Sequence, residues 1–171
     1  MNYCKHKISS VIFERCRETI FDWVKWSQSG FQRNRSASEN LWILRNLFEK
    51  AREYDCVYYI ISIDYKAAFD GISRNAIYEI LSSFLPLKLV HRVMQLYDGA
   101  RLAISTPDPN KNNFFDHSMG IKQGCPASPS FFTAVLSFLT FSVSTVFKGI
   151  SLGSLNLLSL EYADDQIYTT V

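Results

Sequence analysis

Several features that would point to other kinds of protein are missing from this chain. Its four cysteines have no C-x-x-C spacing and no histidine at metal-ligand spacing, which excludes the common zinc sites. We see no signal peptide, so we expect reduced thiols inside a cell. No repeat, low-complexity tract or linker interrupts the 171 residues, and this length predicts one domain. The net charge of +2 is too small to indicate a nucleic-acid partner by itself.

Positive charge is absent from the C-terminal part of the chain. More than half of the Lys and Arg residues lie between Lys5 and Arg52, whereas residues 149–171 have none and carry Glu161, Asp164 and Asp165. A polyanion lying across a metal centre would fit this distribution, and solvated helix faces explain it equally well.

Charge of either sign is absent from residues 123–147, a stretch long enough to span a membrane. Two prolines at its start and six Ser or Thr residues between Ser130 and Ser144 argue against that reading. A helix buried against a sheet is also apolar nearly all round, so we expect a core helix and no membrane partner.

Hydrophobic periodicity predicts alternating helices and strands. We expect an amphipathic helix over 8–26 and, after an S-x-x-E capping box at Ser36, a helix over 37–53. The β-branched and aromatic run 57–63 predicts a strand covered on both faces. Further predicted elements are helices over 73–84 and 86–97, strands over 101–105 and 113–118 around the turn 106–112, the uncharged helix, and a final hairpin. This order predicts a layered α/β or α+β domain.

Acidic residues stand at the ends of two predicted strands. Asp64 follows the run VYYIISI, and Tyr162-Ala163-Asp164-Asp165 reads as strand, tight turn and strand with both acids at the tip. Carboxylates that converge from distant strands can hold a pair of Mg²⁺ ions for phosphoryl chemistry, and the Tyr65 carbonyl would be a further oxygen ligand. For Asp70, an acid at a helix start, contact with backbone amides is the favoured role.

Two further segments offer groups for a pocket beside these acids. Phe69 falls in the turn after Asp64, where its ring can wall a pocket. The loop 120–129 contains Gly120 and Gly124, which allow close backbone approach, and Gln123, a donor and acceptor. Ser128 is expected to cap the next helix.

Together these segments closely resemble the reverse transcriptase domain of non-LTR (LINE-type) retrotransposons. The resemblance rests on IDYKAAFD, GIKQGCPASPSFF and LEYADD in that order, and extends upstream to QSGFQRNRSASENLWILRNLFEKA. It implies an α+β right-hand polymerase with fingers over 1–56 and palm over 57–171, in which an antiparallel palm sheet packs on helices. We expect an incomplete core of that enzyme, with the thumb missing.

The resemblance also implies roles for individual residues. Asp64, Asp164 and Asp165 would be the catalytic acids and, with Tyr65, the metal ligands. Two bound Mg²⁺ ions, or Mn²⁺ ions in their place, would activate a primer 3′-hydroxyl and stabilise the leaving pyrophosphate. Phe69 would exclude a ribose 2′-hydroxyl. The other implied nucleotide-binding residues are Tyr65, Gln123, Gly124, Arg35 and Arg33.

One position departs from the family pattern. The family commonly has arginine where this chain has Gln32, and a neutral side chain cannot offset triphosphate charge as a guanidinium does. Arg33, the next residue, is the candidate to compensate.

The resemblance implies RNA-directed DNA synthesis from an RNA template, a DNA primer and dNTPs. It places the protein inside the cell, with a cytoplasmic ribonucleoprotein stage and a nuclear site of action. A group II intron-type reverse transcriptase or an RNA-dependent RNA polymerase is the enzymatic alternative. A catalytically inactive relic that binds nucleic acid or protein is the other.

Overall fold

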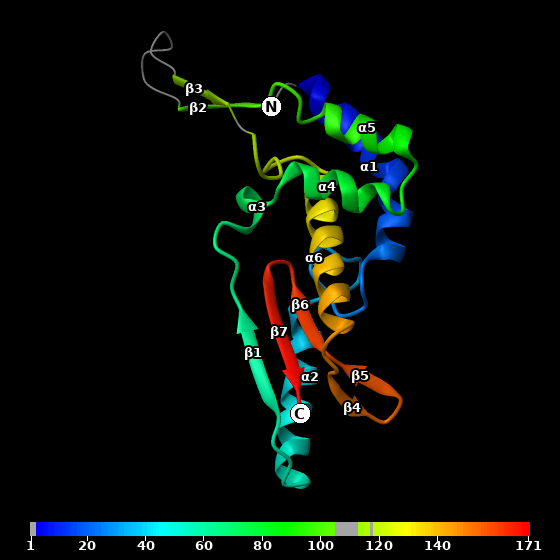
Figure 1. Ribbon diagram of the computed structural model, residues 1–171, viewed down its shortest axis with the longest axis vertical. Helices are drawn as coiled ribbons and strands as arrows, with labels where there is room; N and C mark the ends of the chain where they lie inside the picture. The colour runs from blue at the N-terminus through cyan, green and yellow to red at the C-terminus, as the bar shows by residue number, and fades with distance from the viewer. Residues whose placement is uncertain (1–2, 105–112, 117) are drawn as a thin grey trace.

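The computed structural model describes residues 3–104, 113–116 and 118–171 (Figure 1). Its helices are α1 (Tyr3–Trp23), α2 (Ala37–Glu53), α3 (Ala68–Gly71), α4 (Arg74–Ser82), α5 (Leu87–Gln95) and α6 (Ser128–Ser144). Its strands are β1 (Tyr59–Ile63), β2 (Arg101–Ile104), β3 (Asn113–Asp116), β4 (Ile150–Leu152), β5 (Leu155–Leu157), β6 (Ser159–Tyr162) and β7 (Asp165–Thr170). This mixture of helices with antiparallel strands confirms the α+β prediction.

The central sheet has three antiparallel strands in the order β1-β7-β6. β6 and β7 form a hairpin in which Tyr162 pairs with Asp165, leaving Ala163 and Asp164 as the two-residue loop. β1 pairs with the other edge of β7, with Ile63 opposite Gln166. Segments a hundred residues apart therefore end side by side at one end of the sheet.

The prediction that the 57–63 strand is covered on both faces is wrong. β1 is an edge strand that pairs only with β7 among the described strands, and Val57, Tyr59 and Ile61 are more than half exposed. A β-branched run favours any strand, and its composition does not distinguish an edge from a centre.

The larger hydrophobic core lies where α1 and α4 pack on the N-terminal half of α6, and α5 packs in turn on α1 and α4. Phe131 and Phe132 of α6 are fully buried there against residues such as Ile20 and Ile77. The predicted core helix is confirmed for this half, whereas Phe138, Leu139 and Phe141 in the second half are exposed. Across the described residues, no helix is long and apolar enough to cross a membrane.

A smaller core joins Leu47 of α2 to Leu160 of β6 and to the β4–β5 strands through Ile150 and Leu157. Side chains alternate between the two faces of a strand, so Leu160 and its neighbour Glu161 point to opposite faces of β6. Leu160 packs with Leu47 of α2, and Glu161 bonds to Thr140 of α6. The two helices therefore cover opposite faces of β6.

The helix over 37–53 has the predicted bounds, but the predicted capping box does not form. Ser36 makes no side-chain cap hydrogen bond, and the Glu39 N–H donates to the Ser36 carbonyl instead. The Glu39 carboxylate, which would complete the box, pairs with Arg35. The predicted cap at Ser128 is also wrong. Its hydroxyl donates to the Lys122 carbonyl at 2.6 Å, and Ala127 stands at the cap position.

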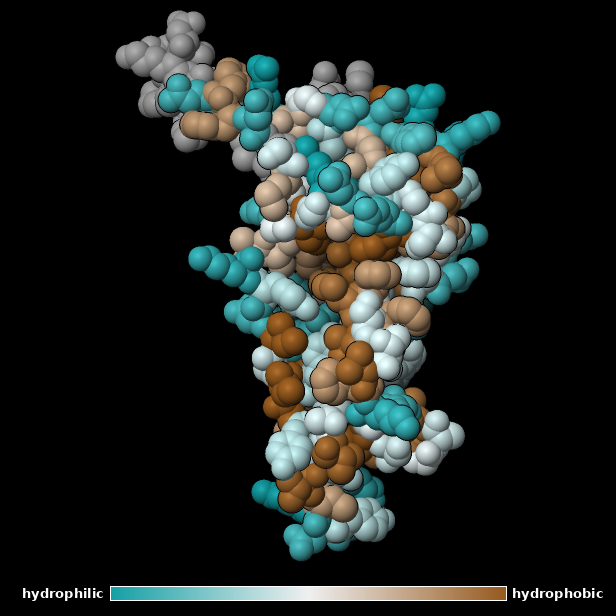
Figure 2. Space-filling model, in the orientation of Figure 1, coloured by the Kyte–Doolittle hydropathy of each residue, from teal (hydrophilic) through white to brown (hydrophobic). Residues whose placement is uncertain are grey.

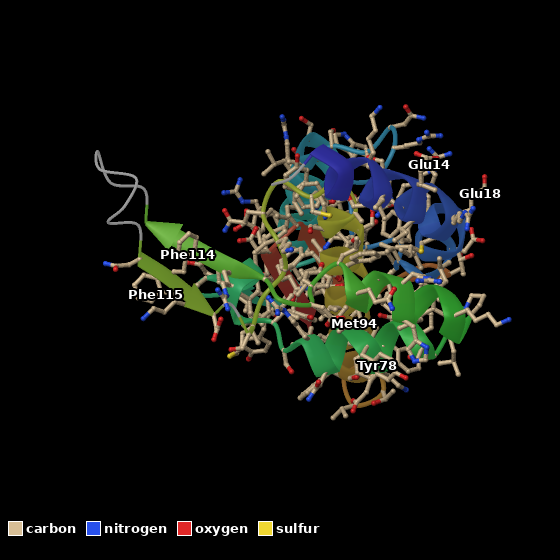
Figure 3. All side chains as sticks on the ribbon, turned by 90° about the horizontal axis from the view of Figure 1, so that it is seen from above. Glu14, Glu18, Tyr78, Met94, Phe114 and Phe115 are labelled. Atoms are coloured by element: carbon tan, nitrogen blue, oxygen red, sulfur yellow. The ribbon has the colours of Figure 1, made fainter. Side chains whose placement is uncertain are left out.

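Two smaller hairpins complete the described structure. The two strands predicted around the turn form as β2 and β3, which pair antiparallel and project from the helical body, with Phe114 and Phe115 exposed on β3 (Figure 3). The predicted turn over 106–112 lies outside the described residues. β4 and β5 form a hairpin that the sequence did not predict, since the run LNLLSL is divided between β5 and β6. The division at residue 56 into fingers and palm stays a prediction.

Candidate functional site

The three predicted catalytic acids lie at one end of the central sheet. Asp64 directly follows β1, whose last residue, Ile63, pairs with Gln166 of β7. Asp165 begins β7, and Asp164 is in the loop of the β6–β7 hairpin. Asp64 and Asp165 are exposed and Asp164 is partly exposed, so all three carboxylates are accessible from outside the chain.

The loop that carries Asp164 has an unusual backbone. Ala163 has a φ of 55°, in the left-handed region, which costs a residue with a Cβ roughly 1–2 kcal/mol. The Gln28 side chain binds both backbone groups of Ala163. Its Oε1 accepts from the Ala163 N–H at 2.9 Å, and its Nε2 donates to the Ala163 carbonyl at 3.1 Å. These bonds offset the cost of the strained loop.

The segment 27–30 lies against β6 like a short extra strand. The Glu161 N–H donates to the Ser27 carbonyl at 2.9 Å, and the Ser29 N–H donates to the Glu161 carbonyl at 2.8 Å. Gly30 follows so closely that a Cβ there would lie 2.1 Å from the Ala163 nitrogen. The segment that resembles the fingers motif is therefore packed directly on the acid-bearing loop.

Glu161 is fully buried at the centre of this contact. Its Oε1 accepts from the hydroxyls of Ser27, Thr140 and Ser159 at 2.8–2.9 Å. Its Oε2 accepts from Gln166 Nε2 at 3.1 Å and from Gln28 Nε2 at 3.5 Å. Hydrogen bonds from four elements thus satisfy a carboxylate that would otherwise be costly to bury.

Tyr65 connects this buried group to the segment after Asp64. Its hydroxyl donates to Gln166 Oε1 at 2.8 Å. Burial, and secondarily the Glu161 carboxylate, raise the pKa of Tyr65 above its ordinary value. Tyr65 is therefore a neutral hydrogen-bond donor at physiological pH, and its ring is directed into the protein.

Phe69 lies in a cavity of about 320 Å³ that is also lined by Gln123, Gly124, Cys125, Ser128 and Pro129. The Phe69 ring stacks on Phe132 at 4.2 Å between centroids, and Phe31 meets its edge at 6.5 Å. The structure therefore brings together Phe69, Gln123 and Gly124, three of the predicted nucleotide-binding residues. Phe31 connects them to the loop that packs on Ala163.

Backbone contacts fix the loop 120–129 to the segment around Phe69. Gly120 donates to the Ile72 carbonyl and Ile121 donates to the Phe69 carbonyl, both at 2.8 Å. Gly120 has a φ of 79°, and a Cβ there would lie 2.8 Å from the Asp70 Cα. Only glycine fits at this crossing. Asp70 itself is exposed.

Arg33 and Arg35, which were predicted to bind the nucleotide, do not line this cavity. Arg35 forms an ion pair with Glu39, donates to the Trp26 carbonyl at 3.1 Å, and lies over the Trp26 ring. Arg33 is exposed. The Gln32 amide nitrogen is buried and has no hydrogen-bond partner among the described residues. The Arg35 guanidinium is thus held by Glu39 and Trp26, and its predicted contact with a nucleotide stays a prediction.

The acids at the sheet end have the donor chemistry that Mg²⁺ prefers, since carboxylate and carbonyl oxygens are its usual ligands. Within the described part of the chain, no group of three or more His, Cys, Asp or Glu side chains forms a ready-made metal site. Mg²⁺ is commonly bound by one or two carboxylates together with substrate phosphates and water. The chemistry of these acids thus suits a metal that arrives with its substrate, and the assignment of Asp64, Tyr65, Asp164 and Asp165 as its ligands stays a prediction.

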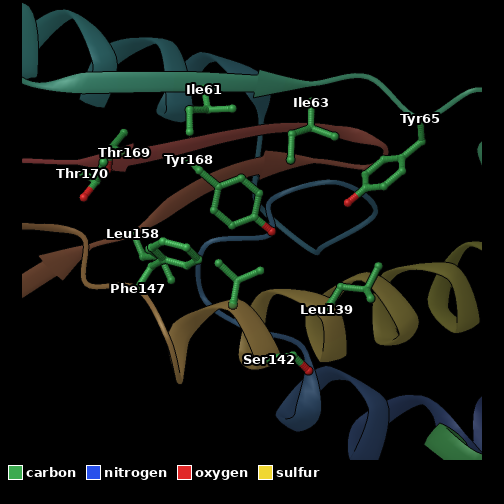
Figure 4. A pocket seen from close by; sticks show the side chains of 11 residues that line it. Ile61, Ile63, Tyr65, Leu139, Ser142, Phe147, Leu158, Tyr168, Thr169 and Thr170 are labelled. Atoms are coloured by element: carbon green, nitrogen blue, oxygen red, sulfur yellow. The ribbon is translucent and has the colours of Figure 1, made fainter.

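A separate apolar groove of about 510 Å³ runs between the sheet and the second half of α6 (Figure 4). Ile61, Ile63 and Tyr168 line it from the sheet, and Leu139 and Val143 line it from the helix. Hydrophobic side chains gather on this face of the molecule (Figure 2). No charged side chain lines the groove, so it is distinct from the acid-bearing end of the sheet.

Sequence reasoning missed the residues that hold the site together. Gln28 entered the sequence analysis only as the first residue of the segment QSGFQRNRSASENLWILRNLFEKA, and Glu161 only as a member of LEYADD and of a region without positive charge. The available signal was a glutamate directly after the apolar run LNLLSL, where a strand was expected to be buried. An acid at such a position needs several hydrogen-bond donors around it.

Three comparisons connect this arrangement to known proteins. The reverse transcriptase (RNA-dependent DNA polymerase) family matches residues 5–171. A retrovirus-related Pol polyprotein from the type-2 retrotransposable element R2DM of Drosophila melanogaster is 25% identical over 147 residues, which cover 84% of this chain and 14% of the relative. A corresponding polyprotein from a type-1 element R2 of Popillia japonica is 27% identical over 141 residues, or 81% of this chain and 20% of the relative.

A solved structure of apo telomerase from Candida tropicalis, truncated from the C-terminal domain, shares the fold. It aligns with a TM-score of 0.57 and 16% identity over 97% of this chain and 33% of that one. The chain thus spans about a seventh to a fifth of the two polyproteins. The family match over residues 5–171 confirms the predicted resemblance: this chain belongs to the reverse transcriptase family.

Proposed function

We propose that this chain is the catalytic core of an RNA-directed DNA polymerase of a non-LTR retrotransposon. The observation that carries the proposal is the convergence of Asp64, Asp164 and Asp165 at one end of the sheet. The resemblance to R2 polyproteins supports a retroelement enzyme over a group II intron-type enzyme or a viral RNA polymerase. The reaction is transfer of a nucleotide from a dNTP to a primer 3′-hydroxyl on an RNA template.

Asp64 and Asp164, with the Tyr65 carbonyl, would hold the metal, and Asp165 would lie toward the primer end. Bound Mg²⁺ supplies charge stabilisation at the reacting phosphate and lowers the pKa of the attacking hydroxyl. The protein contributes two strand ends that hold the carboxylates, and a backbone that positions Asp164. Mn²⁺ has the same preference for oxygen ligands and would substitute.

The nucleotide would lie in the cavity around Phe69, with Gln123 and Gly124 beneath it. Phe69 is held from behind by Phe132, so its ring cannot retreat to admit a 2′-hydroxyl. Arg33 is exposed and free to meet the triphosphate, and Arg35 would join after leaving Glu39. Within the full retroelement protein we place the reaction in the nucleus, after a cytoplasmic ribonucleoprotein stage.

The test is extension of a DNA primer on an RNA template by purified protein containing this chain, with dNTPs or rNTPs and with Mg²⁺ or EDTA. We expect extension with dNTPs and Mg²⁺ only. Preference for rNTPs would indicate an RNA polymerase. Absence of extension by the folded protein, under every condition, would support a relic that retains the residues without the activity.

A further inference from the structure

Glu161 is a buried acid without a basic partner. It is fully inaccessible to solvent, and among the described residues no Lys or Arg forms an ion pair with it. Five side-chain donors take the place of a cation. Such a group is costly to bury, and buried ionic groups are weak evidence for a gain in stability. Its presence on β6 therefore calls for a role other than stability.

The neighbouring backbone allows only one orientation of the Gln28 side-chain amide, with its oxygen as acceptor and its nitrogen as donor. Gln28 Oε1 accepts from the backbone N–H groups of Gly30 and Ala163, which can only donate. The amide orientation of Gln28 is therefore fixed, and its Nε2 must donate to Ala163 and Glu161. A residue at position 161 must consequently accept hydrogen bonds on that side.

Two chains of hydrogen bonds lead from Glu161 to the two acid-bearing segments. Through Gln28 it reaches Ala163, the residue before Asp164. Through Gln166 it reaches the Tyr65 hydroxyl, one residue after Asp64. Tyr65 enters this network from the sheet side of α6 (Figure 4). The segments that must converge on one metal thus share a single buried anchor.

We propose that Glu161 is a positioning residue for the catalytic carboxylates: it fixes the spacing between the segments that carry Asp64 and Asp164. Its contacts with Ser27 and Gln28 also fix the segment 27–30 against the hairpin loop that carries Asp164. This inference rests on the proposed polymerase function. Glu161 touches neither substrate nor metal and acts through Gln28, Gln166 and Tyr65.

Two variants test the anchor with little change in volume. Glu161→Gln has almost the same shape but replaces an acceptor oxygen by a donor that faces the donors of the network. Gln28→Leu keeps the bulk of the side chain and removes both bonds to Ala163. Ile77→Val is the control, because it perturbs the main core around α4 and lies outside the network.

The first readout is hydrogen–deuterium exchange of the metal-free protein, which does not depend on activity. We expect Glu161→Gln to speed exchange in both segments, 64–69 and 162–166. Gln28→Leu should speed it in 27–31 and 162–166, with a smaller effect at 64–69. Ile77→Val should leave these three segments as in the wild type.

The second readout is primer extension by the same proteins, with rates expressed per active site titrated by the pre-steady-state burst. Residues that orient metal ligands typically affect metal affinity or activity by about 10- to 100-fold when replaced. We expect Glu161→Gln to raise the half-saturating Mg²⁺ concentration, or lower kcat, within that range, while KM for dNTP changes little. A purely structural role would reduce the burst amplitude and leave the rate per site and the Mg²⁺ dependence unchanged.

The outcomes separate the two proposals. Wild-type Mg²⁺ dependence and unchanged exchange in folded Glu161→Gln would overturn the positioning role and leave the polymerase assignment intact. If the wild type itself does not extend primers, the proposed function fails, and with it a role in catalysis. Exchange that loosens at both acid-bearing segments, together with a weaker Mg²⁺ response, would establish the anchor.

Discussion

Phe69 stacks face to face on Phe132, with 4.2 Å between ring centroids and 11° between ring planes. Phe132 is fully buried in α6 and cannot move without disturbing the larger core. This contact gives Phe69 a fixed position beside Gln123 and Gly124. Under the proposed function, a rigid ring at that position would discriminate between sugars that differ by one hydroxyl.

We predict that Phe69→Val weakens the preference for dNTPs over rNTPs by about 10- to 100-fold, because the smaller side chain leaves room for the 2′-hydroxyl. The measurement is kcat/KM for a matched dNTP and rNTP pair on one primer–template. Phe141→Val, on the exposed part of α6, is the matched control and should keep the wild-type ratio. An unchanged ratio in Phe69→Val would remove Phe69 from sugar selection.

The close approach of Gly30 to Ala163 predicts a large effect of one added methyl group. A Cβ at position 30 would lie 2.1 Å from a backbone nitrogen, which cannot move as a flexible side chain could. We expect Gly30→Ala to lower the free energy of unfolding by roughly 1–3 kcal/mol, measured by urea denaturation. Gly71→Ala, whose nearest neighbour would be 3.9 Å away, should change it by less than about 0.5 kcal/mol. Equal effects of the two substitutions would contradict the docking of the 27–30 segment.

The ion pair between Arg35 and Glu39 predicts that Glu39 competes with the nucleotide. Glu39→Gln should release the guanidinium and lower KM for dNTP by about two- to fivefold, the equivalent of a partly exposed pair worth roughly 0.5–1 kcal/mol. Glu49→Gln breaks the exposed pair with Arg45 on the same helix and serves as the control. A rise in KM for Glu39→Gln would show instead that Glu39 holds Arg35 in its working position.

Tyr97 predicts a loss of stability in alkaline solution. Burial raises its pKa from 10 to about 12, so the folded chain keeps the proton at pH values where the unfolded chain loses it. The resulting contribution is complete below pH 10 and is lost as pH rises to 12, by roughly 2–3 kcal/mol in all. Urea unfolding at pH 9, 10 and 11 measures this slope.

Tyr97→Phe should flatten the fall between pH 10 and 11. The matched control is Tyr59→Phe, which removes the same hydroxyl from an exposed side chain on β1. A slope that stays the same in Tyr97→Phe would mean that other groups account for the alkaline loss.

Local sequence patterns predicted the parts of the fold that depend on local interactions. The helix over 37–53 has a regular apolar face, and the Tyr162–Asp165 turn lies between two short strand patterns, so both were found where expected. The exposure of β1 was not predictable in the same way, because it depends on which strands and helices lie beside it. The part of the predicted capping box that uses the Glu39 carboxylate is lost for a related reason, since Arg35 binds that carboxylate.

In the candidate site, too, the residues within local motifs were predictable and the long-range contacts that support them were not. Asp64, Asp164, Phe69 and Gln123 stand in recognisable motifs, and the structure places them at the sheet end and in the neighbouring cavity. The support beneath them comes from partners more than a hundred residues apart in sequence, such as Gln28 with Ala163. No periodicity or spacing connects such a pair before the chain is folded.

Primer extension by Asp164→Asn tests the central claim most directly. The substitution keeps the size of the side chain and removes the charge that would hold the metal, so metal-assisted stabilisation of several kcal/mol should be lost. We predict at least about a 100-fold lower extension rate than the wild type at saturating Mg²⁺ and dNTP, with an unchanged circular dichroism spectrum and melting temperature. Extension close to the wild-type rate by the folded variant would contradict a polymerase site at the end of this sheet.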